Sequence, residues 1–276
     1  MRKAKDKTLK FLMSLCAAVT CLLLIGLIGY LLYRGIPGIN AKFLTTQTSY
    51  ISDSIGILPN ILNTLYLIVL VMIIVVPLGV GAAVYLTEYA SNKRISNAIG
   101  FAVETLTGIP SIIFGLVGML FFTQILGLRQ GILAGSLTLI IMVLPTVISN
   151  TKESLLAVPQ SYREGALALG SGKWHMVRTV VLPNAVDGIV TGCILAVGRV
   201  VGESAALLFT AGFGLKLLGF VEALQSSAAS LTVALYIYAS EEGKFDVAFS
   251  IAVILICITL IINLAASLVG KKVRKS

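Results

Sequence analysis

The stretch ILNTLYLIVLVMIIVVPLGVGAAVY, residues 61–85, runs for 25 positions without a charged side chain. An α-helix rises about 1.5 Å per residue, so this stretch can cross the roughly 30 Å hydrocarbon core of a bilayer. The whole chain of 276 residues is 57% hydrophobic and 12% charged, with a mean hydropathy of +0.99. Because about a quarter of the residues of a soluble domain are charged, the sequence predicts an integral membrane protein.

Five further windows approach or exceed the roughly 20 apolar residues that a membrane-spanning helix needs. The strict alternation of apolar and polar residues that is typical of a membrane β-barrel is absent from the sequence. The predicted fold class is therefore an all-α integral membrane protein, a bundle of six transmembrane helices. The six windows are residues 11–32, 61–85, 97–125, 132–149, 186–211 and 247–269.

The first window follows a basic segment, as the apolar part of a secretory signal would. Its apolar run is longer than the roughly 7–15 residues of a signal. The segment YLLYRGIPG, residues 30–38, offers no small-residue cleavage site. We therefore expect the first helix to be retained.

The basic residues are distributed unequally between the two sides of the predicted bundle. With the N-terminus inside, cytoplasmic segments hold fifteen Lys and Arg residues, outer segments hold five, and Arg199 lies within a span. This excess follows the positive-inside rule and predicts that both termini are cytoplasmic. The net charge of +9 is then mostly a topology signal that also attracts anionic membrane lipid, so we expect no nucleic-acid partner.

The residues that could carry metal or acid–base chemistry are few. The four cysteines all fall within predicted spans and lack metal-ligand spacing, so we expect no metal and no cofactor. The single histidine lies in a loop, away from any cluster of nucleophiles or carboxylates, which argues against a membrane enzyme. These residues are Cys16, Cys21, Cys193, Cys257 and His175.

The cytoplasmic segment 151–183 is far longer than a tight turn between two helices, which usually has about 2–8 residues. Ser161 and Glu164 have the spacing of a helix capping box, and Gly170 ends the helical pattern that follows. We interpret the segment as a docking element for a partner protein, with a solvated connector as the alternative. Its apolar side chains are Leu167, Leu169, Trp174, Met176 and Val177.

Two outer segments are also long. Residues 34–60 contain GIPG and a patch rich in Ser and Thr, which predicts irregular structure. Residues 212–246 contain SLTVALYIYASEE, which is too short to span a membrane. We expect it to form a short helix at the outer surface, with a re-entrant segment as the alternative.

The tetrapeptide GSGK, residues 170–173, resembles the end of a phosphate-binding P-loop. That motif requires a glycine at the position of Leu167 and a Ser or Thr at the position of Trp174. Both requirements fail, so we expect no nucleotide-hydrolysing site and no enzymatic activity in this chain.

The window 186–211 carries two charges, Arg199 and Glu203, four residues apart. In a continuous helix, Arg199 lies near the middle of the bilayer and Glu203 lies on the same face, one turn further out. A charge at this depth is costly and should face the bundle interior together with a partner. The pair either joins two helices or lines a path for an anion. We favour the path, because apolar packing could join helices without burying charge.

Small and helix-breaking residues lie near these charges and in other windows. Glycines at i,i+4 spacing let another helix approach closely. Prolines inside three windows predict kinked helices around a cavity. These residues are Gly188, Gly192, Gly198 and Gly202, and Pro77, Pro110 and Pro145.

The stretch EGALALGSGKWHMVRTVVLP, residues 164–183, resembles the EAA loop of type I ABC importer permeases. That pattern is Glu-Ala-Ala, a Gly after three further residues, and an ending of a hydrophobic residue, Leu and Pro. The matching positions are Glu164, Gly165, Ala166, Gly170, Leu182 and Pro183, with Gly165 in place of the first Ala. The resemblance implies that these residues couple the permease to an ATP-binding subunit, which hydrolyses the ATP.

Two further stretches resemble the phosphate importers of this family, and the PstA-type subunit in particular. They are TLTGIPSIIFGLVG, residues 105–118, and GRVVGESAALLFTAG, residues 198–212. Glu203 is followed by Ser204, where Glu-Thr is commoner in the family. The resemblance implies a substrate path that includes Arg199, Glu203, Ser204, Pro110 and Ser111.

The resemblance also implies an assembly in the cytoplasmic membrane of a bacterium or archaeon. Its partners would be a PstC-type sister permease, a dimer of PstB-type ATP-binding subunits and a PstS-type phosphate-binding protein. The expected divisions are an N-terminal helix and outer loop (1–59), the permease core (60–270) with its coupling loop (151–183), and a basic tail (271–276). A permease for sulfate or molybdate, or a secondary transporter, is the alternative.

Overall fold

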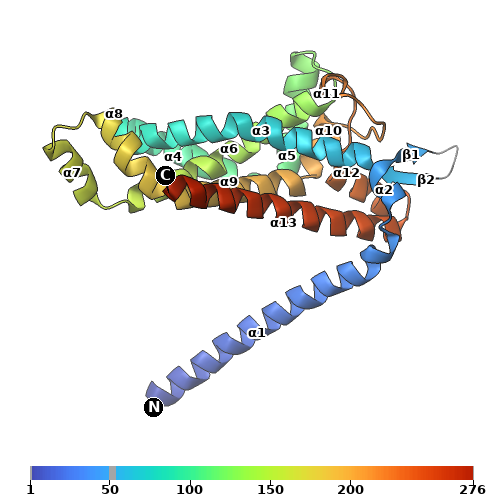
Figure 1. Cartoon of the computed structure of the whole chain (residues 1–276), viewed down its shortest axis with the longest axis horizontal. Coiled ribbons are helices and arrows are strands. Elements are labelled where there is room, and N and C mark those ends of the chain that lie inside the picture. Colours follow the sequence, from blue (N-terminus) through green and yellow to red (C-terminus); the bar gives the residue numbers. More distant parts are fainter. Residues whose placement is uncertain (1, 50–53, 276) are drawn as a thin grey trace.

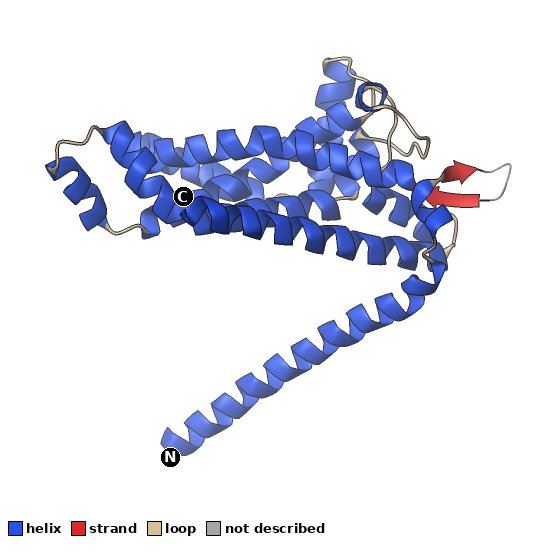
Figure 2. Cartoon of the chain, in the orientation of Figure 1, coloured by secondary structure: helices blue, strands red, loops and turns tan. Residues whose placement is uncertain are grey.

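The computed structural model describes residues 2–49 and 54–275, and the regular structure in this part of the chain is helical apart from one short hairpin (Figures 1 and 2). The longer helices are α1 (Arg2–Gly35), α3 (Leu58–Val84), α4 (Lys93–Thr107), α6 (Ile132–Ala157), α9 (Leu182–Gly202) and α13 (Phe245–Lys275). The shorter helices are α2 (Ala41–Thr45), α5 (Ser111–Gly118), α7 (Gln160–Ala168), α8 (Lys173–Met176), α10 (Ala205–Thr210), α11 (Phe220–Leu224) and α12 (Leu231–Tyr236). A 3-10 turn, η1 (Ile36–Gly38), and π-helical segments also occur, namely η2 (Tyr85–Tyr89), η3 (Met119–Ile125), η4 (Val177–Val181) and η5 (Ile237–Glu241).

Within the described residues, five helical segments are long and apolar enough to cross a membrane, which confirms the predicted helical bundle. A sixth span results only if α4 and α5 are counted together, and these two helices are bent by 100°. The prediction of one continuous helix over residues 97–125 is therefore wrong. The five segments are Leu9–Gly38, Leu58–Tyr89, Ile132–Ala157, Lys173–Gly202 and Phe245–Lys271.

Proline explains some of the helix ends but not all of them. The break between α4 and α5 falls at Pro110, which has no N–H group to continue the helical hydrogen bonds. Helix α6 runs past the predicted end at residue 149 and stops where Val158 is extended before Pro159. Pro77 and Pro145 lie inside α3 and α6, and both helices continue through them.

The predicted span 186–211 is also broken. Helix α9 ends at Gly202, Glu203 is extended with φ −81° and ψ 124°, and α10 begins at Ala205. Arg199 therefore lies in the last turn of one helix, whereas Glu203 lies outside that helix. The two side chains do not share a helical face.

The core of the bundle is built where α3 packs on α6 and α6 packs on α9. One of the predicted glycine pairs explains the second contact, since a Cβ atom on Gly192 would lie 2.8 Å from the Cβ atom of Asn150. Gly188 likewise faces Ser154. Around Gly198 and Gly202, in contrast, no atom outside the neighbouring part of α9 lies within 4 Å of an added Cβ, and the two glycines line a groove beside α13.

Helix α1 diverges from the bundle and meets it only near its C-terminal end, beside α13 (Figure 1). None of its apolar membrane window is buried. At the junction, Arg34 Nη2 donates a hydrogen bond to Asp246 Oδ1 at 2.8 Å.

The two segments predicted to lie outside the membrane are more ordered than the sequence suggests. Residues 34–60 form η1, α2 and the antiparallel hairpin of β1 (Gln47–Ser49) and β2 (Ser54–Ile57), where irregular structure was predicted. The short helix predicted near residues 230–242 is confirmed as α12. Its residues Leu231 and Ala234 are fully buried against α13 and its neighbours.

Candidate functional site

The predicted coupling loop, residues 151–183, contains the end of α6, then α7, α8 and η4. Helix α7 projects beyond one end of the bundle, and no residue of α7 is fully buried (Figure 1). Leu169 is 91% exposed and Trp174 is 60% exposed, and Leu167 is also exposed. Met176 and Val177 were predicted as exposed anchors, but both are buried in the cluster that joins this loop to α3.

The two ends of α7 are formed differently from the prediction. The capping box of Ser161 and Glu164 is wrong, because the helix begins directly after Pro159 and has no side-chain cap. The C-terminal end is confirmed at Gly170, whose φ of +81° belongs to the left-handed region that favours glycine. Two nested hydrogen bonds close this end: the Ser171 N–H donates to the Ala166 carbonyl, and the Gly170 N–H donates to the Leu167 carbonyl.

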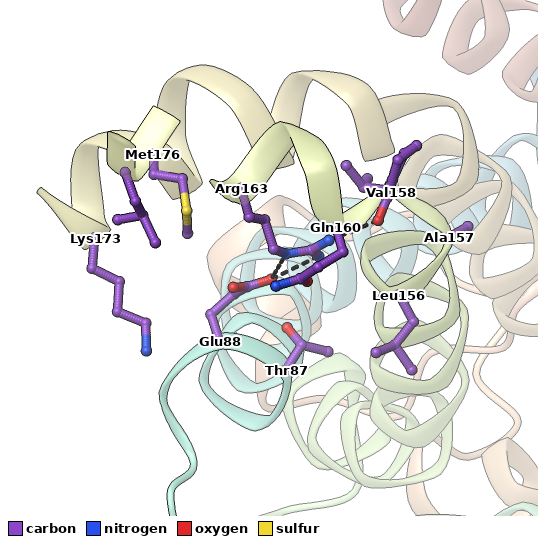
Figure 3. A pocket seen from close by; sticks show the side chains of 11 residues that line it. Thr87, Glu88, Leu156, Ala157, Val158, Gln160, Arg163, Lys173 and Met176 are labelled. Carbon is purple, nitrogen blue, oxygen red and sulfur yellow. Dashed lines mark hydrogen bonds and ion pairs between the residues drawn. The ribbon is translucent and has the colours of Figure 1, made fainter. Parts of the chain in front are cut away.

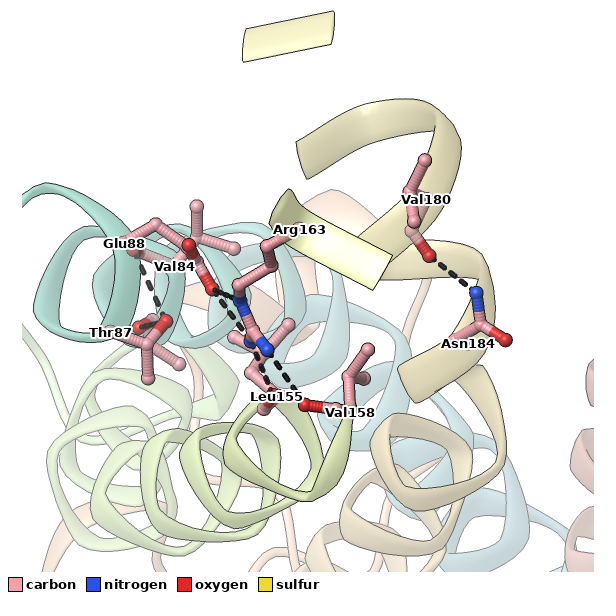
Figure 4. Close-up of polar contacts among 9 residues, drawn as sticks. Val84, Thr87, Glu88, Leu155, Val158, Arg163, Val180 and Asn184 are labelled. Carbon is pink, nitrogen blue, oxygen red and sulfur yellow. Dashed lines mark hydrogen bonds and ion pairs between the residues drawn. The ribbon is translucent and has the colours of Figure 1, made fainter. Parts of the chain in front are cut away.

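A buried ion pair that the sequence reasoning missed holds α7 against the bundle (Figure 4). Arg163 Nε and Nη2 donate to Glu88 Oε1 at 3.1 and 2.9 Å. The side chains of Arg163 and Glu88 are only 11% and 6% exposed. Glu88 belongs to η2, so this pair connects the coupling loop to the end of α3.

The same guanidinium also closes the end of α6. Arg163 Nη1 donates to the Val158 carbonyl and Nη2 to the Leu155 carbonyl, each at 2.7 Å. The Leu155 carbonyl also accepts the Val158 N–H, at 3.3 Å, so the guanidinium adds further donors to the carbonyls at this helix end. Charge-assisted bonds of this kind are stronger than bonds between neutral groups.

Beside the ion pair lies a groove with a volume of about 550 Å³, shown in Figure 3. Its walls come from the end of α3, the end of α6 and the coupling loop, and they include Thr87, Gln160 and Lys173. Lys173 Nζ lies 5.0 Å from the centre of the Tyr89 ring, a cation–π contact between α8 and η2.

The predicted path residues form a second region, and the structure separates two of them. No ion pair joins Arg199 to Glu203 within the described residues. Arg199 Nη1 instead donates a long hydrogen bond of 3.4 Å to Thr146 Oγ1 on α6. Glu203 is buried, at 8% exposure, and its Oε1 accepts a hydrogen bond of 3.0 Å from the Ala206 N–H. Each charge therefore lies at a helix end of favourable sign, Arg199 at the C-terminus of α9 and Glu203 at the N-terminus of α10.

The other three predicted path residues lie at helix starts. Pro110 and Ser111 begin α5, and Ser204 precedes α10. Helices α5 and α10 pack closely, since a Cβ atom on Gly115 would lie 2.7 Å from Ala206 Cα. The two helices that follow the breaks thus lie side by side. Within the described part of the chain, no group of three or more His, Cys, Asp or Glu residues could hold a metal ion.

A family model, the inner membrane component of binding-protein-dependent transport systems, matches residues 75–275. The chain belongs to this family. It is therefore a multi-pass component of the inner membrane and the permease part of an ABC importer, a part that has no ATPase site of its own. Such a transporter also contains ATPase subunits and works with a binding protein.

Two curated relatives illustrate how far the likeness extends. The permease is 37% identical to the probable ABC transporter permease protein YqgI of Bacillus subtilis (strain 168), over 99% of this chain and 98% of that protein. It is 35% identical to the phosphate transport system permease protein PstA 1 of Mycobacterium tuberculosis (strain CDC 1551 / Oshkosh), over 71% of this chain and 64% of that protein.

Solved structures share the fold of the permease. A chain of the bacterial alginate ABC transporter, in complex with a pentasaccharide-bound periplasmic protein, matches with a TM-score of 0.68 at 17% identity, over 100% of this chain and 98% of that chain. A chain of the MetNI methionine ABC transporter in an inward-facing conformation matches with a TM-score of 0.63 at 22% identity, over 79% and 94%. These likenesses confirm the type I importer fold.

One sequence signal could have revealed the missed ion pair of the permease. Glu88 is the only acidic residue between Asp53 and Glu104, and it stands at the end of a predicted span. A single carboxylate in that position requires a cation nearby. Arg163, directly before Glu164 of the loop pattern, is the cation that the fold supplies.

Proposed function

We propose that this permease is the PstA-type subunit of a phosphate importer, which forms half of the translocation path and couples it to a separate ATPase. The observation that carries the coupling role is the projecting α7, with exposed apolar side chains and a buried attachment to the bundle. Such a combination fits a rigid element that presents anchors to a partner protein.

The substrate is supported by the relatives that are named as phosphate permeases. Likeness to the PstC protein of Mesorhizobium japonicum, at 33% identity, nearly equals the likeness to the PstA protein. Overall identity therefore supports phosphate more strongly than it supports the type of subunit. The stretch ESAALLFTAG, residues 203–212, is what favours PstA.

The proposed assembly contains a PstC-type sister permease, two PstB-type ATP-binding subunits and a PstS-type phosphate-binding protein. The ATP-binding subunits would contact Glu164, Gly165, Ala166, Gly170, Leu182 and Pro183. Residues 60–270 would form the permease core, after an N-terminal helix and outer loop (1–59) and before a basic tail (271–276).

The proposed orientation has both termini and α7 in the cytoplasm. It rests on the excess of basic residues on that side. Figure 1 supports it, because the C-terminus lies near the α8 end of the bundle and the hairpin lies at the opposite end.

The proposed path runs along Arg199, Glu203, Ser204, Pro110 and Ser111. Arg199 is partly exposed and makes one long side-chain bond, so most of its guanidinium donors can face an anion. A phosphate oxyanion is a good partner for such a planar fork of donors. The alternative is that Arg199 only joins α9 to α6 through Thr146.

The decisive experiment is transport by the purified complex in liposomes. The permease, its sister subunit, the ATPase and the binding protein are reconstituted, and ATP-driven uptake of radiolabelled phosphate, sulfate and molybdate is compared. We expect uptake of phosphate to exceed that of the other two at least tenfold. Preferred uptake of sulfate or molybdate would contradict phosphate as the substrate. Uptake by a preparation without ATPase subunits would show that the protein is a secondary transporter.

A further inference from the structure

Helix α7 is attached to the bundle mainly through polar contacts. It has no fully buried side chain, and Ala166 is its one residue that packs, half-buried, against the adjoining apolar cluster. Hydrophobic burial therefore gives it little stability in its position. The bonds of Arg163 are the strongest contacts that connect it to other elements.

A single guanidinium connects three elements. Arg163 starts on α7, binds Glu88 on η2, and binds the Leu155 and Val158 carbonyls at the end of α6. Figures 3 and 4 show this fork reaching between the helices. A lysine could place a charge near Glu88, but it lacks the planar array of five donors that serves all three groups at once.

Stability alone does not account for a charged pair at this place. Two charges that are 11% and 6% exposed lose much of their hydration, and apolar residues of similar size often give equal or greater stability. What the pair adds is a fixed geometry, because its bonds are directional and because removal of one partner leaves the other charge buried and unpaired.

We propose that Arg163 and Glu88 are the positioning residues that transmit a displacement of α7 to membrane helix α3. This inference rests on the proposed function, in which α7 contacts the ATPase. A force applied at the exposed face of α7 then reaches η2 and α3 through Glu88, and α6 through its last carbonyls. Without the pair, α7 moves with the ATPase while the membrane helices stay behind.

The test measures coupling rather than transport alone. Arg163→Gln and Glu88→Gln are reconstituted in the full complex, and the ATP hydrolysed per anion imported is determined, with the oxyanion that the wild type transports best as the probe. We expect each variant to keep most of its ATPase activity and to import at least tenfold less anion than the wild type. The number of ATP molecules hydrolysed per anion imported should therefore rise by about the same factor. Arg94→Gln, at an exposed arginine whose side chain makes no hydrogen bond or ion pair in the described structure, is the matched control and should keep the wild-type ratio.

A second readout follows the position of α7 directly. In a cysteine-free background, spin labels at Ser91→Cys and Ala168→Cys report the distance between the end of η2 and α7 in the full complex. We expect a narrow distance distribution in the wild type and a broad one in Glu88→Gln. An unchanged distribution together with an unchanged ratio of ATP to anion would overturn the proposal.

Arg163→Lys covers the case in which Arg163→Gln does not assemble. The lysine retains the charge opposite Glu88 but cannot also bind both the Leu155 and Val158 carbonyls. We therefore expect normal assembly and an intermediate ratio of ATP hydrolysed to anion imported. A wild-type ratio in Arg163→Lys would contradict the transmission role. If the pair variants match the wild type while Glu164→Arg uncouples, only this inference fails; if Glu164→Arg also transports normally, the proposed contact with the ATPase fails.

Discussion

The carboxylate of Glu203 accepts a hydrogen bond from the backbone N–H of Ala206 at 3.0 Å, and it makes no ion pair with Arg199. The acid thus closes the start of α10, which would otherwise have an unpaired donor inside the bundle. Its role in the fold is to define the break between α9 and α10.

Glu203→Gln and Glu203→Ala should therefore behave differently. Glutamine retains an oxygen that accepts the Ala206 N–H, so we expect complex assembly to stay near the wild-type level while uptake falls at least tenfold with the charge. Alanine removes the acceptor, and loss of such a cap costs about 0.5–2 kcal/mol, so assembly should fall as well. Assembly is measured as the yield of co-purified complex. Wild-type uptake by Glu203→Gln would show that the carboxylate of Glu203 is not part of the substrate path.

Arg199 and Glu203 should contribute to stability independently. Because each charge interacts with a helix end instead of with its neighbour, the effects of Arg199→Gln and Glu203→Gln should add within about 0.5 kcal/mol. The measurement is unfolding of the four members of the double-mutant cycle in detergent. A coupling energy above about 1 kcal/mol, or uptake restored by exchanging the two residues, would show that they form a pair.

Arg199→Gln should abolish uptake and leave assembly intact, because the neutral side chain still reaches Thr146 but no longer attracts an anion. Arg199→Lys should keep part of the uptake, since it preserves the charge and loses the fork of donors. Arg129→Gln, an exposed arginine outside the proposed path, is the control. Wild-type uptake by Arg199→Gln would show that Arg199 only joins α9 to α6 and does not bind the transported anion.

Gly170→Val and Glu164→Arg should uncouple the ATPase for different reasons. Valine at φ +81° is strained by about 1–2 kcal/mol and should disturb the end of α7, whereas Glu164→Arg reverses an exposed charge and leaves the fold unchanged. Binding of the ATPase subunit is measured by co-purification, with uptake alongside. Transport at the wild-type rate in both variants would show that the loop is not the contact.

The orientation can be checked by labelling in intact cells. Cysteines introduced at the exposed positions Val221 and Ser91 lie at opposite ends of the bundle in the proposed topology. An impermeant thiol reagent should label Val221→Cys from outside and should label Ser91→Cys only after the cells are opened. The reverse pattern would invert the topology and remove α7 from the cytoplasm.

The parts of the fold that could be predicted are those that local sequence determines. Uninterrupted apolar runs define α3 and α13, Pro159 defines the end of α6, and the small side chain of Gly170 permits the turn after α7. The break after Gly202 could not be predicted, because it depends on distant groups. The Thr232 hydroxyl, for example, donates to the Glu203 carbonyl at 2.8 Å.

The candidate site was predictable to a similar extent. Spacing alone identified the loop and the exposed Leu169 and Trp174, which the structure confirms as exposed. The attachment of the loop was not predictable in the same way, because Arg163 and Glu88 are 75 positions apart and meet only when α3 and α6 pack together. For the same reason the buried positions of Met176 and Val177 escaped a pattern-based analysis.

The ion pairs at the two ends of the bundle differ in their exposure to mobile ions. Arg34 and Asp246 are 44% and 80% exposed, so dissolved salt screens the bond that holds α1 beside α13. Arg163 and Glu88 are shielded from counterions, and screening of such a buried pair is weak. A rise in salt at the hairpin end of the bundle would therefore weaken the contact of α1 with α13, whereas the same rise at the α7 end would leave the pair of Arg163 and Glu88 nearly unchanged.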